Sequence, residues 1–264
     1  MPIVKQYPDG VFSWIDLTTT DVAGAKEFYS GLFGWSADDV PTGDGPDYTM
    51  FRIDGHSVAG AGPMDPAMQA NGAPPVWISY VSHHDIDAVA TRATEAGGVV
   101  FMPPMDVMEE GRLALVQDPA GAVFGLWQPR NHLGASLVNQ PNTLVWNELQ
   151  TRDTAAARAF YQQVFGWSDQ VDNNNYVTFK NNDRAQCGSL QLDDSWGDAP
   201  VNWQVYFMVE DVDATAARVT ELGGMVLMGP RQITGWGRLM VVRDPQGATF
   251  SVMEFDGPVA DPPG

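Results

Sequence analysis

The chain has 264 residues, of which 44% are hydrophobic and 11% aromatic, so it is long and apolar enough to bury a substantial core. Its 33 acidic and 14 basic residues give a formal net charge of −19, which repels nucleic acids and anionic membrane surfaces. The lone cysteine, Cys187, excludes an internal disulfide, and we find no signal peptide and no membrane-spanning apolar stretch. We therefore expect a cytoplasmic protein with neither nucleic-acid nor membrane partners.

The first predicted unit occupies residues 11–62. A strand over 11–18 leads into a cluster of helix N-cap residues, "TTTD", and then into an apolar pattern at helical spacing that stops at Gly34. Glycine is the residue preferred where a helix ends in the left-handed conformation. Three further strands are predicted near 35–40, 48–53 and 56–62.

The second predicted unit repeats this β-α-β-β-β order over residues 75–128. It begins with a strand over 75–81 and continues with a helix that stops at Gly97-Gly98. A strong turn signal, "DPAG", separates the last two strands. These three strands are predicted near 99–106, 112–117 and 122–128.

The second half of the chain is a copy of the first. Residues 12–36 align with 144–168 at an offset of 132, without a gap. Residues 84–104 and 111–127 align with later segments at an offset of 126. Such a long period indicates two duplicated domains rather than a solenoid. We predict a first domain at 10–129, a linker at 130–141, a second domain at 142–256 and a flexible tail at 257–264.

The repeated motifs "D…A..FY…FGW" and "D(I/V)DA…E.GG…DP.G" resemble the vicinal oxygen chelate superfamily, the group of glyoxalase I, the extradiol dioxygenases and the bleomycin-resistance proteins. The resemblance covers nearly the whole chain, and is greatest to tandem two-domain glyoxalase-like proteins of bacteria. It implies an α+β fold in which two βαβββ modules of each domain form a curled mixed sheet around a cavity.

The resemblance also implies a divalent metal, held in the cavity by His, Gln or Glu on inward-facing strand positions. We carried each expected ligand position over to both domains of this chain. The three positions fall on Trp14 and Trp146, on Ile78 and Gln204, and on Gly125 and Ser251, with the residue of the first domain named first. An indole donates hydrogen bonds but cannot ligate a metal, and of these six residues only Gln204 can serve as a weak ligand. We therefore predict that the chain uses neither a metal nor another cofactor.

A tryptophan and an acid recur together on the opening strand of each domain. Trp14 and Asp16, like Trp146 and Glu148, are two residues apart and so share one face of a strand. The opposite face, with Ile15 and its neighbours, is expected to pack under the helix. By the same parity the inward-facing set also includes Phe12, Trp127, Leu144, Asn202, Gln204 and Tyr206.

A buried carboxylate without a partner is unfavourable, so each acid must face water, a ligand or an internal partner. One hypothesis is that the cavities bind or sequester a small organic molecule, with an aromatic ring stacked on the indoles and a polar group bonded to the acids. The ligand-binding residues would then be Trp14, Asp16, Trp127, Trp146, Glu148, Gln204 and Tyr206. Alternatively, the indoles fill the cavities and the acids pair with Arg52, Arg112 or Arg238.

A further alternative is an enzyme of the same superfamily, a lyase, isomerase or hydroxylase that acts on a small carbonyl metabolite. Asp16 or Glu148 would act as general base, while Tyr206 and Gln204 would place the substrate. The sequence assigns no catalytic residue and favours neither a monomer nor a homodimer. The histidines, including the adjacent pair His83-His84, are expected at the surface without a third metal ligand nearby. Cys187 is expected in the core.

Overall fold

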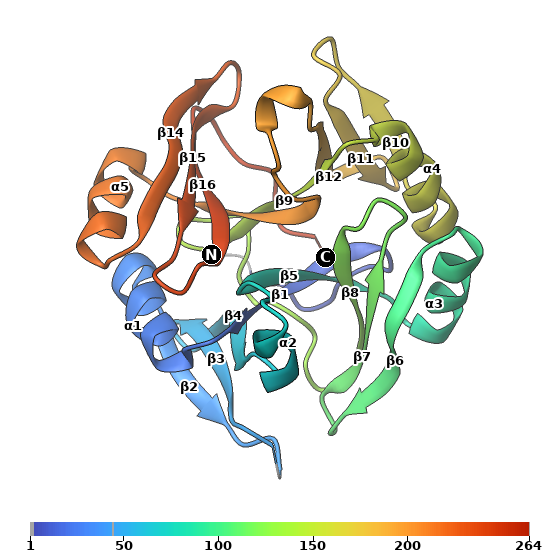
Figure 1. The fold of residues 1–264 in the computed structure, drawn as a ribbon, viewed down its shortest axis with the longest axis horizontal. Helices are drawn as coiled ribbons and strands as arrows, with labels where there is room; N and C mark the ends of the chain where they lie inside the picture. Colours follow the sequence, from blue (N-terminus) through green and yellow to red (C-terminus); the bar gives the residue numbers. More distant parts are fainter. Residues whose placement is uncertain (1–2, 44, 264) are drawn as a thin grey trace.

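The computed structural model describes residues 3–43 and 45–263 and contains two eight-stranded sheets, one in each half of the chain (Figure 1). The strand order of the first sheet is β2-β3-β4-β1-β5-β8-β7-β6, and the second sheet repeats it as β10-β11-β12-β9-β13-β16-β15-β14. Two strand pairs in each sheet are parallel and the others are antiparallel. The predicted α+β class and the tandem arrangement of two domains are confirmed, with sheets that curl without closing into barrels.

The elements follow the predicted order in both domains. The strands of the first sheet are β1 (Val11–Thr19), β2 (Ser36–Val40), β3 (Tyr48–Ile53), β4 (His56–Pro63), β5 (Val76–Ser82), β6 (Val99–Val107), β7 (Gly111–Gln117) and β8 (Val123–Pro129). Those of the second are β9 (Leu144–Thr151), β10 (Ser168–Val171), β11 (Val177–Asn181), β12 (Arg184–Gln191), β13 (Asn202–Met208), β14 (Met225–Ile233), β15 (Gly237–Arg243) and β16 (Thr249–Phe255). The helices are α1 (Val22–Phe33), α2 (Pro66–Ala70), α3 (Ile86–Glu95), α4 (Thr154–Phe165), α5 (Val212–Glu221) and the 3₁₀ helix η1 (Asp194–Trp196).

An aspartate caps the N-terminus of each of the four long helices, and the first of these aspartates belongs to the predicted "TTTD" cluster. Each N-cap carboxylate accepts a hydrogen bond from the backbone N–H three residues later, which satisfies one of the free donors of the first turn. Helices α1 and α4 end at Gly34 and Gly166, which adopt φ values of 70° and 74°. The sequence did not predict α2 and η1, which lie in the long loops before β5 and β13.

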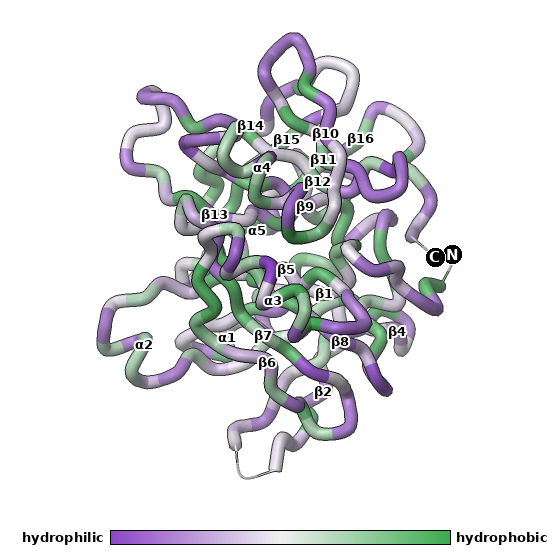
Figure 2. Tube along the Cα trace, turned by 90° about the vertical axis from the view of Figure 1, so that its right-hand side faces the viewer, coloured by the Kyte–Doolittle hydropathy of each residue, from purple (hydrophilic) through white to green (hydrophobic). Residues whose placement is uncertain are grey.

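The two domains share their hydrophobic cores. Helix α1 lies beside α5 and helix α3 beside α4, so each of these four long helices packs next to one from the other domain (Figure 1). One buried cluster joins Ile15 and Phe28 of the first domain to Phe207 and Phe250 of the second. A second cluster joins the α3 side of the first domain to the α4 side of the second. In Figure 2 the hydrophilic segments are concentrated in the peripheral loops, around these central strands.

The central strands of the two sheets meet back to back. The hydroxyl of Ser79 on β5 donates to Oδ1 of Asn147 on β9 at 2.6 Å, and both residues are buried. Ile15 and Leu17, which were expected to pack under the helix, are fully buried and belong to this interdomain core together with Phe28 of α1. Trp14 and Asp16 alternate with them and lie on the other side of the sheet. We call that side the cavity face of the first sheet, and the side of Trp146 and Glu148 that of the second.

The predicted inward position of Phe12 is wrong. A register shift between Phe12 and Trp14 interrupts the alternation along β1, so parity does not carry across it. Phe12 instead packs in the interdomain core, where its ring centroid lies 4.9 Å from that of Trp203. Strand β9 has the same irregularity, and Leu144 likewise packs in the interdomain core.

Among the described residues, none of the helices is both long and apolar enough to span a membrane.

Candidate functional site

The cavity face of the first sheet holds a connected group of two tyrosines, an indole and an acid. The indole Nε1 of Trp14 donates to the hydroxyl of Tyr48 at 3.0 Å. The hydroxyls of Tyr48 and Tyr80 donate to Oδ2 of Asp16 at 3.4 and 3.2 Å. Trp14 is only 4% exposed, whereas Asp16 is half-buried. The acid is therefore held by neutral phenol donors and stays within reach of solvent.

The cavity face of the second sheet repeats this group with a longer acid. The indole Nε1 of Trp146 donates to the hydroxyl of Tyr176 at 3.0 Å, and the hydroxyl of Tyr206 donates to Oε1 of Glu148 at 2.7 Å. Here the exposure is reversed, because Glu148 is only 6% exposed whereas Trp146 is half-buried.

Glycines make room for the tyrosines. A Cβ atom added to Gly60 would lie 1.8 Å from the Tyr48 hydroxyl, and one added to Gly188 would lie 1.8 Å from the Tyr176 hydroxyl. At Gly125 an added Cβ would lie 2.1 Å from the ring of Tyr80. No side chain fits at these strand positions unless a tyrosine moves.

The second cavity face is the more polar of the two. Asn202 donates through Nδ2 to Oε1 of Gln204 at 3.1 Å, and Gln204 donates through Nε2 to the hydroxyl of Ser251 at 3.2 Å. At the corresponding positions the first sheet has only apolar residues or glycine, namely Val76, Ile78 and Gly125.

The linker covers the first cavity face. Trp127 donates through Nε1 to the backbone carbonyl of His132 at 2.8 Å, and the His132 imidazole lies edge-on to Trp14 with centroids 4.4 Å apart. Burial lowers the pKa of His132 to about 4, so the ring is neutral at pH 7. The expected surface role is therefore wrong for His132, because its ring is half-buried and packs against Trp14 and Trp127.

Both acids have raised pKa values. Burial raises the pKa of Asp16 to about 7, although the hydrogen bonds from Tyr80 and Tyr48 act in the opposite direction. Burial likewise raises the pKa of Glu148 against the hydrogen bonds that it accepts, the largest of them from Tyr206. Since burial also raises the pKa of each phenol, the tyrosines remain protonated donors.

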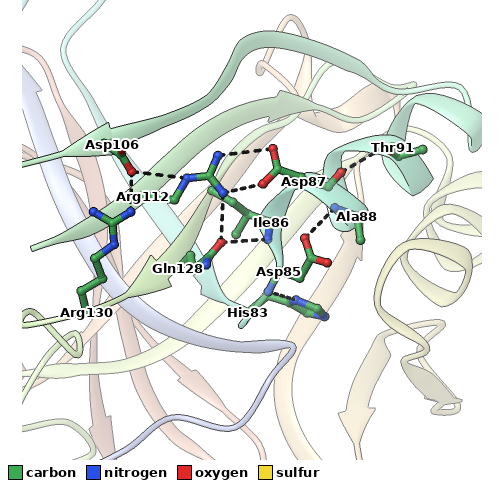
Figure 3. Close-up of polar contacts among 10 residues, drawn as sticks. All are labelled: His83, Asp85, Ile86, Asp87, Ala88, Thr91, Asp106, Arg112, Gln128 and Arg130. Atoms are coloured by element: carbon green, nitrogen blue, oxygen red, sulfur yellow. Dashed lines mark hydrogen bonds and ion pairs between the residues drawn. The ribbon is translucent and has the colours of Figure 1, made fainter.

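The arginines considered as partners of these acids are engaged elsewhere. Arg112 pairs with Asp87 and Asp106 beside helix α3 (Figure 3), where Arg130 also reaches Asp106. Arg238 pairs with Asp213 at 2.6 Å and Arg52 with Asp38 at 2.9 Å. The alternative in which arginines hold Asp16 and Glu148 is therefore wrong, because tyrosines donate hydrogen bonds to both acids.

The seven residues predicted to bind a ligand divide between the two cavity faces. The first face carries Trp14, Asp16 and Trp127. The second face carries Trp146, Glu148, Gln204 and Tyr206.

Sequence reasoning missed Tyr48, Tyr80 and Tyr176. A signal for two of them was present, since Tyr48 and Gly60 both recur at an offset of 128, as Tyr176 and Gly188. Cys187, by contrast, is fully buried in the interdomain core, as expected.

On each cavity face one oxygen of the carboxylate accepts hydrogen bonds from phenols: Oδ2 of Asp16 from Tyr48 and Tyr80, and Oε1 of Glu148 from Tyr206. In the part of the chain that the structure describes, the group of three His, Cys, Asp or Glu side chains close enough to hold a metal ion is Asp9, His83 and His84, outside both cavity faces.

The architecture is that of paired βαβββ modules, with one pair in each half of the chain. The family described as "Glyoxalase/Bleomycin resistance protein/Dioxygenase superfamily" matches residues 11–126, and the family described as "Glyoxalase-like domain" matches residues 146–253. The chain belongs to this glyoxalase and bleomycin-resistance superfamily, with one domain in each half, and the predicted resemblance is confirmed.

Relatives of the whole chain are also known. "Putative glyoxylase CFP32" from Mycobacterium tuberculosis is 42% identical over 96% of this chain and 98% of its own length. "Anthracycline biosynthesis protein DauV" from Streptomyces sp. is 37% identical over 96% of both chains.

Solved structures support the same fold. The 2,3-dioxygenase LapB from Pseudomonas sp. KL28 has a TM-score of 0.65 at 14% identity, over 96% of this chain and 95% of its own. An Mn(II)-bound glyoxalase from Novosphingobium aromaticivorans has a TM-score of 0.62 at 16% identity, over 95% of this chain and 84% of its own.

Proposed function

We propose that the cavity faces bind a small organic molecule without the metal ion on which the enzymes of this superfamily depend. The observation that carries the proposal is the Trp–Tyr–carboxylate group, which occurs once in each domain. Its indoles, Trp14 and Trp146, stand where the resemblance to the family implies the first metal ligand. A divalent metal requires about three suitable ligands, and the residues on either face do not fit such a set.

The second cavity face is the stronger candidate for the binding site. Trp146 is half-buried, so an aromatic ligand can reach part of its indole, whereas the linker covers Trp14. Glu148, Gln204 and Tyr206 add both hydrogen-bond donors and acceptors beside it. A flat molecule stacked on Trp146 can therefore direct a hydroxyl or amine toward these groups. Trp14, Asp16 and Trp127 remain the proposed contacts of the first face.

The relatives supply a chemical class for this ligand. Two of them, each 37% identical over 96% of this chain, carry names from anthracycline biosynthesis. Anthracyclines are flat polycyclic aromatic molecules that bear hydroxyl groups, which is the chemistry that an indole beside a carboxylate would recognise. We therefore propose a polycyclic aromatic ligand of this kind.

The test is quenching of tryptophan fluorescence by a commercially available anthracycline. Saturable quenching is expected in the wild type and is expected to weaken in Trp146→Phe and in Glu148→Gln. The matched control is Trp236→Phe, because Trp236 is 61% exposed and lies at the turn between β14 and β15, away from the cavity faces. Equal affinity in the wild type and both site variants would overturn the proposed site.

A second candidate function is general base catalysis by Asp16. Its carboxyl is half-buried with a pKa of about 7, and an acid with a pKa near the working pH is well suited to abstract a proton. The substrate would be a small carbonyl compound with an acidic α-proton. The assay is turnover of the methylglyoxal–thiol adduct by the wild type and by Asp16→Asn, with and without added Zn²⁺ or Ni²⁺. Turnover that is absent from the wild type, or unchanged in Asp16→Asn, would contradict this function.

A further inference from the structure

Three metal-ligating side chains converge outside the cavity faces. Asp9 precedes β1, and His83 and His84 follow β5 directly. One ligand atom from each of the three lies within 4.8 Å of the other two. From the sequence, no third ligand was expected near the two histidines. The fold brings Asp9, which lies 74 positions before His83 in the chain, next to them.

The backbone that carries Asp9 is held on several sides. The Gly10 N–H donates to the carbonyl of Ser82 at 2.8 Å, which ties the segment to the end of β5. From the second domain, Asn181 donates through Nδ2 to the carbonyl of Asp9 at 2.7 Å, and Trp167 donates through Nε1 to the carbonyl of Gly10 at 2.9 Å. Asp9 is therefore placed before any ion arrives, which limits the entropy lost on binding.

The two imidazoles lie on the same side of the chain. Consecutive residues on a regular strand point to opposite faces, but β5 ends at Ser82 and the chain turns into α3. The rings of His83 and His84 consequently stack, with centroids 4.7 Å apart and planes inclined by 19°. Asp9 accepts from the His84 backbone N–H at 2.8 Å, and its other carboxylate oxygen contacts Nδ1 of the same residue.

The cluster is accessible and is absent from the repeat. The side chains of Asp9 and His84 are 45% and 75% exposed, so a hydrated ion can reach them. In the second domain the equivalents of His83 and His84 are Val209 and Glu210, although the same strand-to-helix turn forms there. The turn therefore does not require histidines in order to fold.

We propose that Asp9, His83 and His84 form a binding site for a divalent first-row transition metal such as Zn²⁺, Ni²⁺ or Cu²⁺. Two imidazoles and a carboxylate are ligands that these ions accept, and water completes the coordination. The ion would join the segment before β1 to the turn between β5 and α3.

One contact limits the affinity of this site. Nδ1 of His83 accepts a hydrogen bond from the backbone N–H of Asp85 at 2.9 Å (Figure 3). A metal must either take this nitrogen or bind the other one after the ring changes tautomer, and both routes break the bond. We therefore expect reversible binding that is weaker than at a closed structural zinc site.

The experiment is calorimetric titration of the chelator-treated full-length protein with ZnCl₂ and, separately, with NiCl₂. One equivalent is expected to bind, and saturating metal is expected to raise the melting temperature. His84→Ala and Asp9→Asn should each weaken binding by at least about tenfold, because each loses one of three ligands. The matched control is His56→Ala, which removes a histidine at the start of β4 and should leave binding unchanged.

Two results would overturn the proposal, namely no saturable binding by the wild type, or affinity in both His84→Ala and Asp9→Asn equal to that of the wild type. Both variants should fold, since the side chains of Asp9 and His84 are 45% and 75% exposed, and circular dichroism checks this. Because the readout is metal binding and melting temperature, the outcome is independent of ligand binding at the cavity faces.

Discussion

The hydroxyl of Tyr29 in the first domain donates a hydrogen bond to Oδ2 of Asp244 in the second, at 2.9 Å, and both residues are buried. The other carboxylate oxygen of Asp244 accepts three backbone N–H groups of its own turn. Tyr29 in turn accepts from the indole Nε1 of Trp77 at 3.0 Å. The duplicate forms the same chain of contacts from Trp203 through Tyr161 to Asp118. The "FY" segment of one domain thus contacts the "DP.G" turn of the other across the interface between the domains.

Replacing this tyrosine should destabilise both domains together. Tyr29→Phe leaves a buried indole N–H and a buried carboxylate oxygen without their partner, a loss of about 3 kcal/mol in the free energy of unfolding. Urea unfolding followed by circular dichroism should still show a single transition, because each core contains residues of both domains. Tyr161→Phe is the matched variant and should behave alike. Two separate transitions would contradict the shared core.

Loss of the Tyr206 hydroxyl should destabilise the protein in a pH-dependent manner. Tyr206→Phe removes the hydrogen bond that lowers the pKa of buried Glu148, so that pKa rises further and the ionised form becomes less favourable. We expect a loss of about 1 to 3 kcal/mol, larger at pH 8 than at pH 5.

A matched control is available for this prediction. Tyr7→Phe removes a hydroxyl that donates to the backbone carbonyl of Ala135 at 2.8 Å, so its effect should be the same at both pH values. Urea unfolding at each pH measures both variants. A loss in Tyr206→Phe that does not depend on pH would contradict this prediction, because Glu148 would then keep one protonation state between pH 5 and pH 8.

Asp16→Asn should alter how stability depends on pH. The pKa of Asp16 is about 7 in the folded protein and 3.8 when the side chain is unperturbed, as in the unfolded chain. Between these two pH values the folded protein therefore binds more protons than the unfolded chain. The contribution of Asp16 to stability therefore falls as the pH rises from about 4 to about 7. Asp16→Asn lacks this pH-dependent contribution, so the stability of the variant relative to the wild type should increase as the pH rises from about 4 to about 7.

His132 does not obscure this comparison. Its pKa is lowered from 6.5 to about 4, so its contribution to stability rises with pH over the same range. Because both proteins contain His132, that contribution cancels in the difference between them. Thermal or urea unfolding at several pH values gives the result. A difference that stays constant or decreases with pH would show that the pKa of Asp16 is not raised.

The C-terminal segment should shield part of the Trp146 indole. Val259 and Trp146 both pack against the buried cluster of Val145, Tyr206 and Met253, and Asn139 donates through Nδ2 to the carbonyl of Ala260 at 3.0 Å. A chain that ends at Asp256 should lose about 1 kcal/mol of stability from the apolar contact and should be quenched more strongly by acrylamide. In a Trp146→Phe background the truncation should change quenching little. Equal quenching of the full-length and truncated proteins would show that the segment does not cover this indole.

Local chemistry explains what could be predicted from the sequence. The aspartate N-caps, the glycine that follows "FYSGLF" and the alternation along the strands are signals between residues only a few positions apart. The duplication could be seen because both copies retain these signals. The order of elements, the α+β class and the superfamily were therefore predicted correctly. The face shared by Trp14 and Asp16 was also correct, because β1 is regular between those two positions.

The tertiary structure decided which groups surround those residues. Tyr48 lies 32 positions from the acid that it bonds, and Tyr29 lies 215 positions from Asp244, so no local pattern pairs them. The register shift beside Phe12 reversed a parity argument that was sound only for an unbroken strand. By itself the sequence determined the strands that carry Trp14 and Trp146. Only the packing of distant elements determined that phenols, rather than arginines, hold the acids beside them, because that choice depends on which side chains the folded sheets bring within hydrogen-bond distance.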